Sequence, residues 1–291
     1  MLTHSDAREF AEQLASIPPV HAAEDFEKDG ILHCGKCGEP KQAWIDWFPD
    51  ENGNREKRLV RIMCRCDMEQ EALEKDRIAQ TDFDDAMRKV RLALHTQRDD
   101  VRWRFDQDTE PGNPIARTCR KYVQEWDAMK KDNMGILFYG SKGAGKTFYA
   151  SCIYNALKEK RVLVGFTSAP NLMNILSQWD KTEIYEALTR AHLLVIDDLG
   201  AERGSDYSSE QIYAVIDARY KTGKPTIVTT NIDLEDMKHD ENMMRSRIYD
   251  RVIEMCPIAI PMTGQSRRGA IADARKLKAR ELLDWTKEKQ A

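Results

Sequence analysis

The chain has 291 residues, with 45 Lys or Arg against 49 Asp or Glu, and a formal net charge of -4 at pH 7. This length suits one mid-sized domain with an additional part. The slightly acidic balance excludes a globally positive field, so any contact with nucleic acid must come from a local patch. No apolar run is long enough to span a membrane, and the N-terminal residues lack the apolar core of a secretory signal. We therefore expect a cytoplasmic protein without membrane contacts.

The first 114 residues divide into three segments. Residues 1–30 are acidic and favour a helix. In residues 31–68, two short strand-like stretches, AWIDWF and RLVRIMC, surround closely spaced cysteines, which predicts a small zinc-ribbon-like module. A polar helical stretch at 68–80 opens the linking segment, residues 69–114, which ends at the helix-breaking cluster EPGNP.

The module contains four of the seven cysteines, as one C-x2-C pair and one C-x-C pair: Cys34, Cys37, Cys64 and Cys66. An odd total argues against a disulfide framework. Two close thiol pairs can supply four thiolates to one tetrahedral Zn²⁺, and Gly35 and Gly38 allow the first loop to turn tightly around the ion. Four sulfur ligands leave no position for water, so the predicted site is structural. His33 is an alternative ligand, and a redox-active C-x2-C pair is an alternative function.

From residue 134 onwards, strand and helix patterns alternate. The apolar stretches GILFYG, RVLVGFTS, HLLVIDD and PTIVTTN read as strands, and helical stretches separate them. Nearly continuous apolar strands that alternate with helices predict a parallel sheet with helices on both faces. Together with helical signals at 115–131, this pattern assigns residues 115–291 to one α/β domain.

The segment after GILFYG matches the phosphate-loop pattern G-x-x-x-x-G-K-[ST], with the residues Gly140, Ser141, Lys142, Gly143, Ala144, Gly145, Lys146 and Thr147. Glycines allow backbone amides to bind phosphate oxygens, and Lys146 adds a positive charge at the β- and γ-phosphates. The Thr147 hydroxyl is a candidate ligand of Mg²⁺. Because a strand precedes the pattern and a helix follows it, the sequence predicts a P-loop NTPase that binds ATP and Mg²⁺.

Two acids end the stretch HLLVIDD. Asp197 would hold Mg²⁺ through water, while Asp198 would orient or deprotonate the attacking water. The strand–helix unit that begins with RVLVGFTS (161–168) predicts an additional strand between the phosphate-loop strand and the acidic strand. Such an insertion favours the ATPases that activate water with an acid over nucleotide kinases and small GTPases.

Further polar residues follow the acidic strand. Asn231 ends PTIVTTN, where its amide could contact the attacking water or the γ-phosphate. Five arginines come later in the chain: Arg245, Arg247, Arg251, Arg267 and Arg268. We expect one of them to serve the γ-phosphate, because the negative charge of the transition state needs a mobile cation.

These motifs resemble the AAA+ ATPases of the DnaC/DnaI type, the bacterial and phage loaders of replicative helicases. The resemblance covers the chain from the cysteine module to about residue 270. It rests on GSKGAGKT, LLVIDDLGAE, PTIVTTN, RSRIYDRV and GQSRR, in this order. Several of those loaders also carry a zinc-binding head on the ATPase. The resemblance therefore implies an AAA+ P-loop fold behind a small zinc-binding module.

The resemblance also implies roles for single residues. Asn231 would be sensor I. Arg247 would be the arginine finger that reaches the ATP of a neighbouring subunit, and Arg268 would be sensor II in its own subunit. A finger that acts in trans implies an ATP-dependent, head-to-tail homo-oligomer, which in these loaders engages single-stranded DNA. The zinc module and the N-terminal segment would bind the hexameric replicative helicase.

The implied function is an ATPase that loads a replicative helicase onto single-stranded DNA during DNA replication, with ATP as a switch. Asp198 stands where many AAA+ motors have Glu, so we expect slow hydrolysis that DNA or the partner stimulates. One alternative is a related ATPase that assists a transposase, which ordinarily lacks a zinc head. Others are a clamp that binds ATP with negligible hydrolysis, and a small-molecule kinase, which the motif spacing disfavours.

Overall fold

The computed structural model describes residues 22, 24–47, 53, 55–177, 181–201, 206–263, 276–280 and 282. Contacts divide the chain into two compact units, Met1–Thr81 and Asp82–Ala291. Residues 1–21 of the expected helical segment at 1–30 lie outside the described residues, as do Arg267 and Arg268. The described end of that segment is not helical: Phe26–Lys28 forms a strand, and the positive φ angles of Asp29 and Gly30 turn the chain back. The breaker cluster at 110–114 falls within the second unit.

The first unit contains two small antiparallel hairpins. Strand β1 (Phe26–Lys28) pairs with β2 (Ile31–His33) across a tight turn, in which Asp29 and Gly30 both have positive φ angles, of 52° and 74°. This geometry is that of a two-residue hairpin turn, for which Asp-Gly is a favoured sequence. Strand β3 (Gln42–Asp46) pairs with β4 (Lys57–Arg61). The two stretches that the sequence predicts as strands, AWIDWF and RLVRIMC, therefore do form one hairpin.

Helix α2 (Arg65–Ala93) begins directly after Cys64 and has 29 residues. The sequence predicts a helix only at 68–80, because the later residues carry a mixture of charged and apolar side chains. Met87 and Val90 in its last part, and Leu94 just after it, are buried in the core of the second unit. Burial of this apolar stripe stabilises a helical end that local sequence pattern does not reveal.

The second unit is built on a five-stranded parallel sheet with the strand order β6-β7-β8-β5-β9. Its strands are β5 (Ile136–Gly140), β6 (Val164–Ser168), β7 (Leu193–Leu199), β8 (Thr226–Thr230) and β9 (Ile258–Met262). Every residue of β8 is buried, as are the first three residues of β5. The predicted α/β class with a parallel sheet is confirmed.

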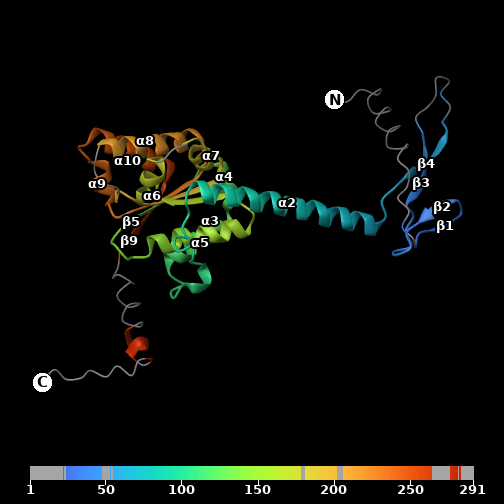
Figure 1. Ribbon diagram of the computed structural model, residues 1–291, viewed down its shortest axis with the longest axis horizontal. Coiled ribbons are helices and arrows are strands. Elements are labelled where there is room, and N and C mark those ends of the chain that lie inside the picture. The colour runs from blue at the N-terminus through green and yellow to red at the C-terminus, as the bar shows by residue number, and fades with distance from the viewer. Residues whose placement is uncertain are drawn as a thin grey trace. The chain divides into compact units, whose positions relative to one another are not determined.

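Helices cover both faces of this sheet, as Figure 1 shows for the second unit. Helix α5 (Lys146–Glu159) lies on one face with α3 (Pro114–Gln124), followed in the chain by α4 (Trp126–Lys131). The other face carries α8 (Asp206–Lys221) and three helices that pack against it, α6 (Ala169–Leu176), α7 (Thr182–Arg190) and α10 (Met243–Met255). Helix α9 (Leu234–Lys238) packs against α10. Right-handed crossovers explain this division. The chain passes from β5 to the edge strand β6 in one direction and then through β7, β8 and β9 in the opposite direction, so the connecting helices lie on opposite faces of the sheet.

The order of the strands corrects one expectation. The sequence predicts that the strand at 161–168 separates the phosphate-loop strand from the acidic strand, but β6 pairs with β7 and forms an edge of the sheet. The strand between β5 and β7 is β8 instead. A strand is still inserted between the two motif-bearing strands, and it is the one that leads to Asn231.

The opposite edge of the sheet is β9, which sequence reasoning missed. Its residues IAIPM include Pro261, and a proline within an apolar run argues against a strand. In the structure β9 pairs on one side only, with β5. Proline is compatible with such an edge position because only one side of the strand must donate hydrogen bonds.

Capping side chains and a proline mark where two of the helices, α3 and α10, begin. Asn113 accepts a hydrogen bond from the backbone of Ala116, and Pro114 occupies the first turn of α3. Asn242 accepts from the amides of Met244 and Arg245 at the start of α10. Asparagine caps and first-turn prolines satisfy or replace amides that a helix leaves unbonded at its N-terminus.

Candidate functional site

The predicted phosphate loop lies between the end of β5 and the start of α5. Gly140 and Gly145 adopt left-handed φ angles of 116° and 101°. A Cβ atom at Gly140 would lie 2.7 Å from the carbonyl oxygen of Met262 on β9. The loop therefore needs glycine for its backbone angles and, at Gly140, for its close packing against a neighbouring strand.

Lys146 is buried at the first position of α5. Its ammonium group donates hydrogen bonds to the carbonyl oxygens of Gly140 at 2.9 Å and Ser141 at 2.8 Å. A third bond, of 2.8 Å, joins it to Oδ1 of Asn231. The structure thus brings together two predicted site residues that are 85 positions apart in the sequence.

Thr147 and Asp197 form a second contact at the same end of the sheet. The Thr147 hydroxyl lies 3.0 Å from each carboxylate oxygen of Asp197. Burial is the main cause that raises the pKa of Asp197 to about 6; the charges of Asp198 and Asp100 contribute to this rise, and the hydroxyl donors Thr229 and Thr147 oppose it. The hydrogen-bond partners of this carboxylate are hydroxyls and its charged neighbours are acids, an arrangement that suits a divalent cation.

Two residues near this acid were missed by the sequence analysis. Thr229 on β8 donates a 2.5 Å hydrogen bond to Oδ1 of Asp197. It stands two positions before Asn231, and alternate strand residues share a face, so this spacing could have identified it. The second is Asp100. Burial is the main cause that raises the pKa of Asp100, and repulsion by the nearby charge of Asp198 contributes to the rise. Its segment, 94–104, carries no motif that would have indicated it.

The arginines of α10 have different partners. Arg245 forms hydrogen-bonded ion pairs with Asp240, at 2.9 and 3.1 Å. Arg251 pairs with Asp217 at 2.8 Å and lies 4.6 Å from the centre of the Tyr213 ring. Arg247 is exposed, and within the described part of the chain no ion pair engages it. Of the three, Arg247 is the one whose guanidinium is available for an outside partner.

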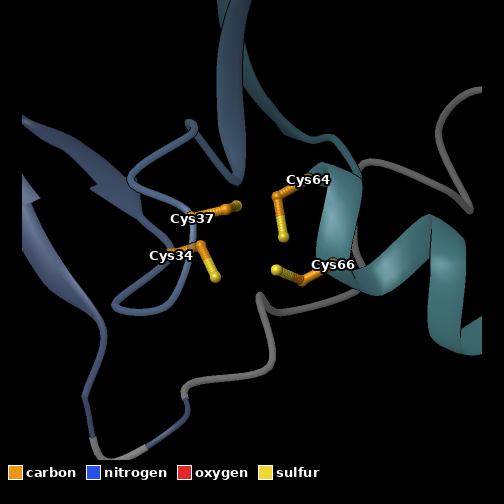
Figure 2. A group of neighbouring side chains, drawn as sticks. All are labelled: Cys34, Cys37, Cys64 and Cys66. Carbon is orange, nitrogen blue, oxygen red and sulfur yellow. The ribbon is translucent and has the colours of Figure 1, made fainter.

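The first unit brings the four predicted metal ligands together. The ligand atoms of Cys34, Cys37, Cys64 and Cys66 all lie within 4.8 Å of one another. Figure 2 shows the four sulfur atoms converging from the first cysteine loop and from the start of α2. His33 is not part of this cluster; its Nδ1 lies 2.9 Å from the carbonyl oxygen of Ile31 and its ring stacks on Phe26. The donor set present is therefore four thiols, which fits a tetrahedral Zn²⁺.

Hydrogen bonds and burial shift the pKa values of three of the four thiols, and not in the same direction. A backbone hydrogen bond at Glu39 is the main cause that lowers the pKa of Cys37 to about 7. Burial raises the pKa of Cys64 to about 12, and a hydrogen bond with Cys37 is the main cause that raises that of Cys66 to about 11. A bound cation would favour the thiolate at all four positions.

A buried ion pair supports the cysteine loop. Lys41 pairs with Asp25 at 2.8 Å, and Asp25 also accepts a 3.1 Å hydrogen bond from the amide of Gly35. The bond with Lys41 is the main cause that lowers the pKa of Asp25 to about 2. This pair links the strand-bearing part of the module to the loop between the first two cysteines.

Within the described residues, no helix is both long enough and apolar enough to cross a lipid bilayer.

Comparisons with known proteins place the second unit among nucleotide-binding proteins. The model of the family "IstB-like ATP binding protein" matches residues 62–289. The replicative helicase loader DnaC of Escherichia coli K12 is 27% identical over 140 residues, which cover 46% of this chain and 55% of that protein. The replicative helicase loader DnaI of Bacillus subtilis 168 is 26% identical over 148 residues, covering 46% and 47%. The chain thus spans about half the length of these curated relatives.

Two solved structures are also similar. The crystal structure of DnaI is 23% identical, with a TM-score of 0.49, over 59% of this chain and 94% of that one. The crystal structure of the DnaC helicase loader is 26% identical, with a TM-score of 0.48, over 57% and 100%.

The family match includes the phosphate loop, both acids and Asn231, whereas Cys34 and Cys37 lie before it. Because it covers most of the sequence, the chain belongs to the family of IstB-like ATP-binding proteins, the AAA+ group of the DnaC type.

Proposed function

We propose that this protein binds and hydrolyses ATP, and that it uses this cycle to load a replicative DNA helicase onto single-stranded DNA during DNA replication. One observation carries the proposal: the contacts Lys146–Asn231 and Thr147–Asp197 join the phosphate loop to the carboxyl ends of the two neighbouring inner strands, β8 and β7. This arrangement occurs in a chain of the DnaC type, with relatives named as replicative helicase loaders. Their names support the choice of helicase as the partner.

The geometry supports distinct roles for these residues. The loop amides and Lys146 would bind the phosphates of ATP. Thr147 and Asp197 would hold Mg²⁺, which would neutralise negative charge on the phosphates. Asp198, whose charge acts on Asp197, would orient or deprotonate the attacking water. Asn231 would add a polar contact to that water or to the γ-phosphate.

The exposed position of Arg247 supports a trans-acting finger. Arg245 and Arg251 are each paired with an aspartate of their own chain, so moving either to a neighbouring nucleotide would break an ion pair. Arg247 carries no such cost. We therefore assign to Arg247 the contact with the ATP of the next subunit in an ATP-dependent homo-oligomer, and to Arg268 a contact within its own subunit.

The cysteine cluster would hold one structural Zn²⁺ through four thiolates. A small module with few buried residues gains stability from such an ion, since metal binding and folding are coupled. We assign to this module, with the N-terminal segment, the binding of the helicase hexamer, while the ATPase unit engages DNA.

The proposed loader is tested by mixing it with the cognate replicative helicase. With ATP present, the protein should capture the helicase in a pull-down and deposit it on circular single-stranded DNA. Lys146→Ala should still fold but fail to deposit the helicase. Absence of any helicase capture, with and without ATP, would contradict the proposed partner.

Turnover distinguishes a loader from a clamp. Asp198→Ala should bind ATP but lose the hydrolysis that single-stranded DNA or helicase stimulates in the wild type. If wild type and Asp198→Ala hydrolyse ATP equally slowly under all these conditions, the protein is a clamp in which ATP only sets the shape. Capture of a transposase in place of the helicase would favour the transposition helper.

A further inference from the structure

A bulge in the sheet lies at the two acids. Strands β7 and β8 pair regularly up to Ile196 and Val228, and pairing resumes at Leu199 and Thr230. Between these pairs β7 has two residues, Asp197 and Asp198, whereas β8 has only Thr229. A bulge of this kind leaves an extra residue outside the ladder and redirects the strand. Here the extra residue is one of the proposed catalytic pair.

The backbone of Asp198 has an unusual conformation at this bulge. Its φ angle is 53°, in the left-handed region that residues other than glycine rarely adopt. Such a conformation has an energetic cost, and it persists when surrounding contacts compensate for that cost. In a regular strand, Asp197 and Asp198 would point to opposite faces, so the bulge changes the direction in which the second acid leaves the chain.

Thr229 supplies the compensating contacts. Its fully buried hydroxyl accepts a 2.9 Å hydrogen bond from the amide of Asp198. The same hydroxyl donates a 2.5 Å bond to Oδ1 of Asp197. A hydroxyl has one proton to donate and can accept at the same time, so a single side chain satisfies both partners. An apolar side chain of the same shape would leave the amide of Asp198 without this partner.

We propose that Thr229 is a positioning residue of the ATPase site: its hydroxyl holds the carboxylate of Asp197 and the backbone of Asp198 in their working orientations. This inference rests on the proposed function, because it concerns the same site. The hydroxyl of Thr147, in the phosphate loop, lies 3.0 Å from both carboxylate oxygens of Asp197, so hydroxyls from two elements contact this acid. Thr229 acts through the acids and needs no contact with ATP.

The test compares two substitutions at one position. Thr229→Val keeps the shape and removes the hydroxyl, while Thr229→Ser keeps the hydroxyl. Thr167→Val is a matched control, since Thr167 is also fully buried, on β6, and its hydroxyl bonds to Leu94 and Asn171 rather than to the acids. Thr229→Ala gives a second hydroxyl-free variant should the valine variant not fold.

The first readout is hydrogen exchange at the amide of Asp198, measured by NMR, which needs no ATP hydrolysis. Exchange there should be about tenfold faster in Thr229→Val than in wild type, because the amide loses its acceptor, and Thr229→Ser should restore protection. The control Thr167→Val should leave this amide unchanged. Unaltered exchange at Asp198 in Thr229→Val would overturn the proposal.

The second readout separates turnover from binding. Thr229→Val should lower kcat by about tenfold or more through misplaced acids, with ATP affinity within about threefold of wild type. Thr229→Ser should recover most of kcat. Equal kcat in Thr229→Val and Thr167→Val, or no recovery by serine, would overturn the positioning role. A wild-type protein without ATPase activity would instead refute the proposed function, and the exchange measurement would still decide whether Thr229 holds Asp198.

Discussion

At the scale of single residues, the site depends on polar side chains whose partners are far apart in the sequence. Lys146 bonds to Asn231 and Thr147 to Asp197, while Thr229 joins Asp197 to the backbone of Asp198. Each of these groups is wholly or partly buried, so an unmade hydrogen bond costs more than it would in water. Single substitutions should therefore have effects that can be assigned to one contact.

Lys146→Ala should abolish ATP binding or hydrolysis, because the point charge for the β- and γ-phosphates is lost. Binding of a fluorescent ATP analogue and phosphate release would measure this. Lys238→Ala is the control, since Lys238 lies on α9, where it pairs with Glu235. A Lys146→Ala protein with ATPase activity equal to the control would refute the phosphate-loop assignment.

Arg219 is a residue outside the candidate site that the fold depends on. It is fully buried and donates to the carbonyl oxygens of four residues and to the hydroxyl of a fifth: Leu188, Ala191, His192, Pro225 and Thr226. Burial lowers its pKa to about 9, so it remains charged at neutral pH. Its side chain links the end of α7 and the starts of β7 and β8.

Arg219→Met should destabilise the protein by about 3 kcal/mol or more, because several buried carbonyl groups lose their donor at once. Urea denaturation would measure the change in the free energy of unfolding. Arg190→Met, which removes an exposed arginine of α7, should change stability by less than about 0.5 kcal/mol. Equal effects of the two substitutions would show that the buried hydrogen bonds contribute little.

At the scale of elements, the cysteine module depends on backbone conformations that only certain residues allow. A Cβ atom at Gly35 would lie 2.0 Å from the carbonyl oxygen of Glu24. Gly38 has a φ angle of 74°, with open space around the position of a Cβ atom. The two glycines of one loop are therefore needed for different reasons, close packing and backbone angle.

Gly35→Ala should disrupt the cysteine loop and lower zinc content, whereas Gly38→Asn should be tolerated, because asparagine adopts the left-handed region more readily than other residues. Metal analysis of the purified variants gives the comparison, with about one zinc per chain expected for the wild type and for Gly38→Asn. A folded wild-type protein without zinc would defeat the metal assignment. Full zinc content in Gly35→Ala would defeat the packing argument alone.

At the scale of the whole molecule, the proposed activity requires assembly. In an ATP-dependent homo-oligomer, each nucleotide would be completed by Arg247 of a neighbouring subunit. The structure supports this by leaving Arg247 exposed while its neighbours on α10 are paired.

Mixtures of inactive variants test the assembly. Arg247→Ala subunits retain the phosphate loop, and Lys146→Ala subunits retain the finger, so mixed interfaces should restore part of the ATPase activity that either variant lacks alone. Arg245→Ala, which removes a paired arginine, should keep most activity by itself. No restoration in mixtures that assemble would contradict a finger that acts in trans.

The sequence by itself determined the features that consist of contiguous residues. The alternation of apolar strands and helices predicts the parallel sheet, and the eight-residue loop and the cysteine pairs can be recognised without coordinates, because their chemistry depends on local spacing. The tertiary structure decided the contacts between distant residues. It placed β8 rather than β6 between the motif strands, added β9 at an edge, and excluded His33 from the thiol cluster. It also showed that Asp240 and Asp217 form ion pairs with two arginines, and that the Thr229 hydroxyl bonds to the carboxylate of Asp197 and to the backbone amide of Asp198. These contacts follow from strand order and helix packing, which bring together side chains that local pattern cannot pair.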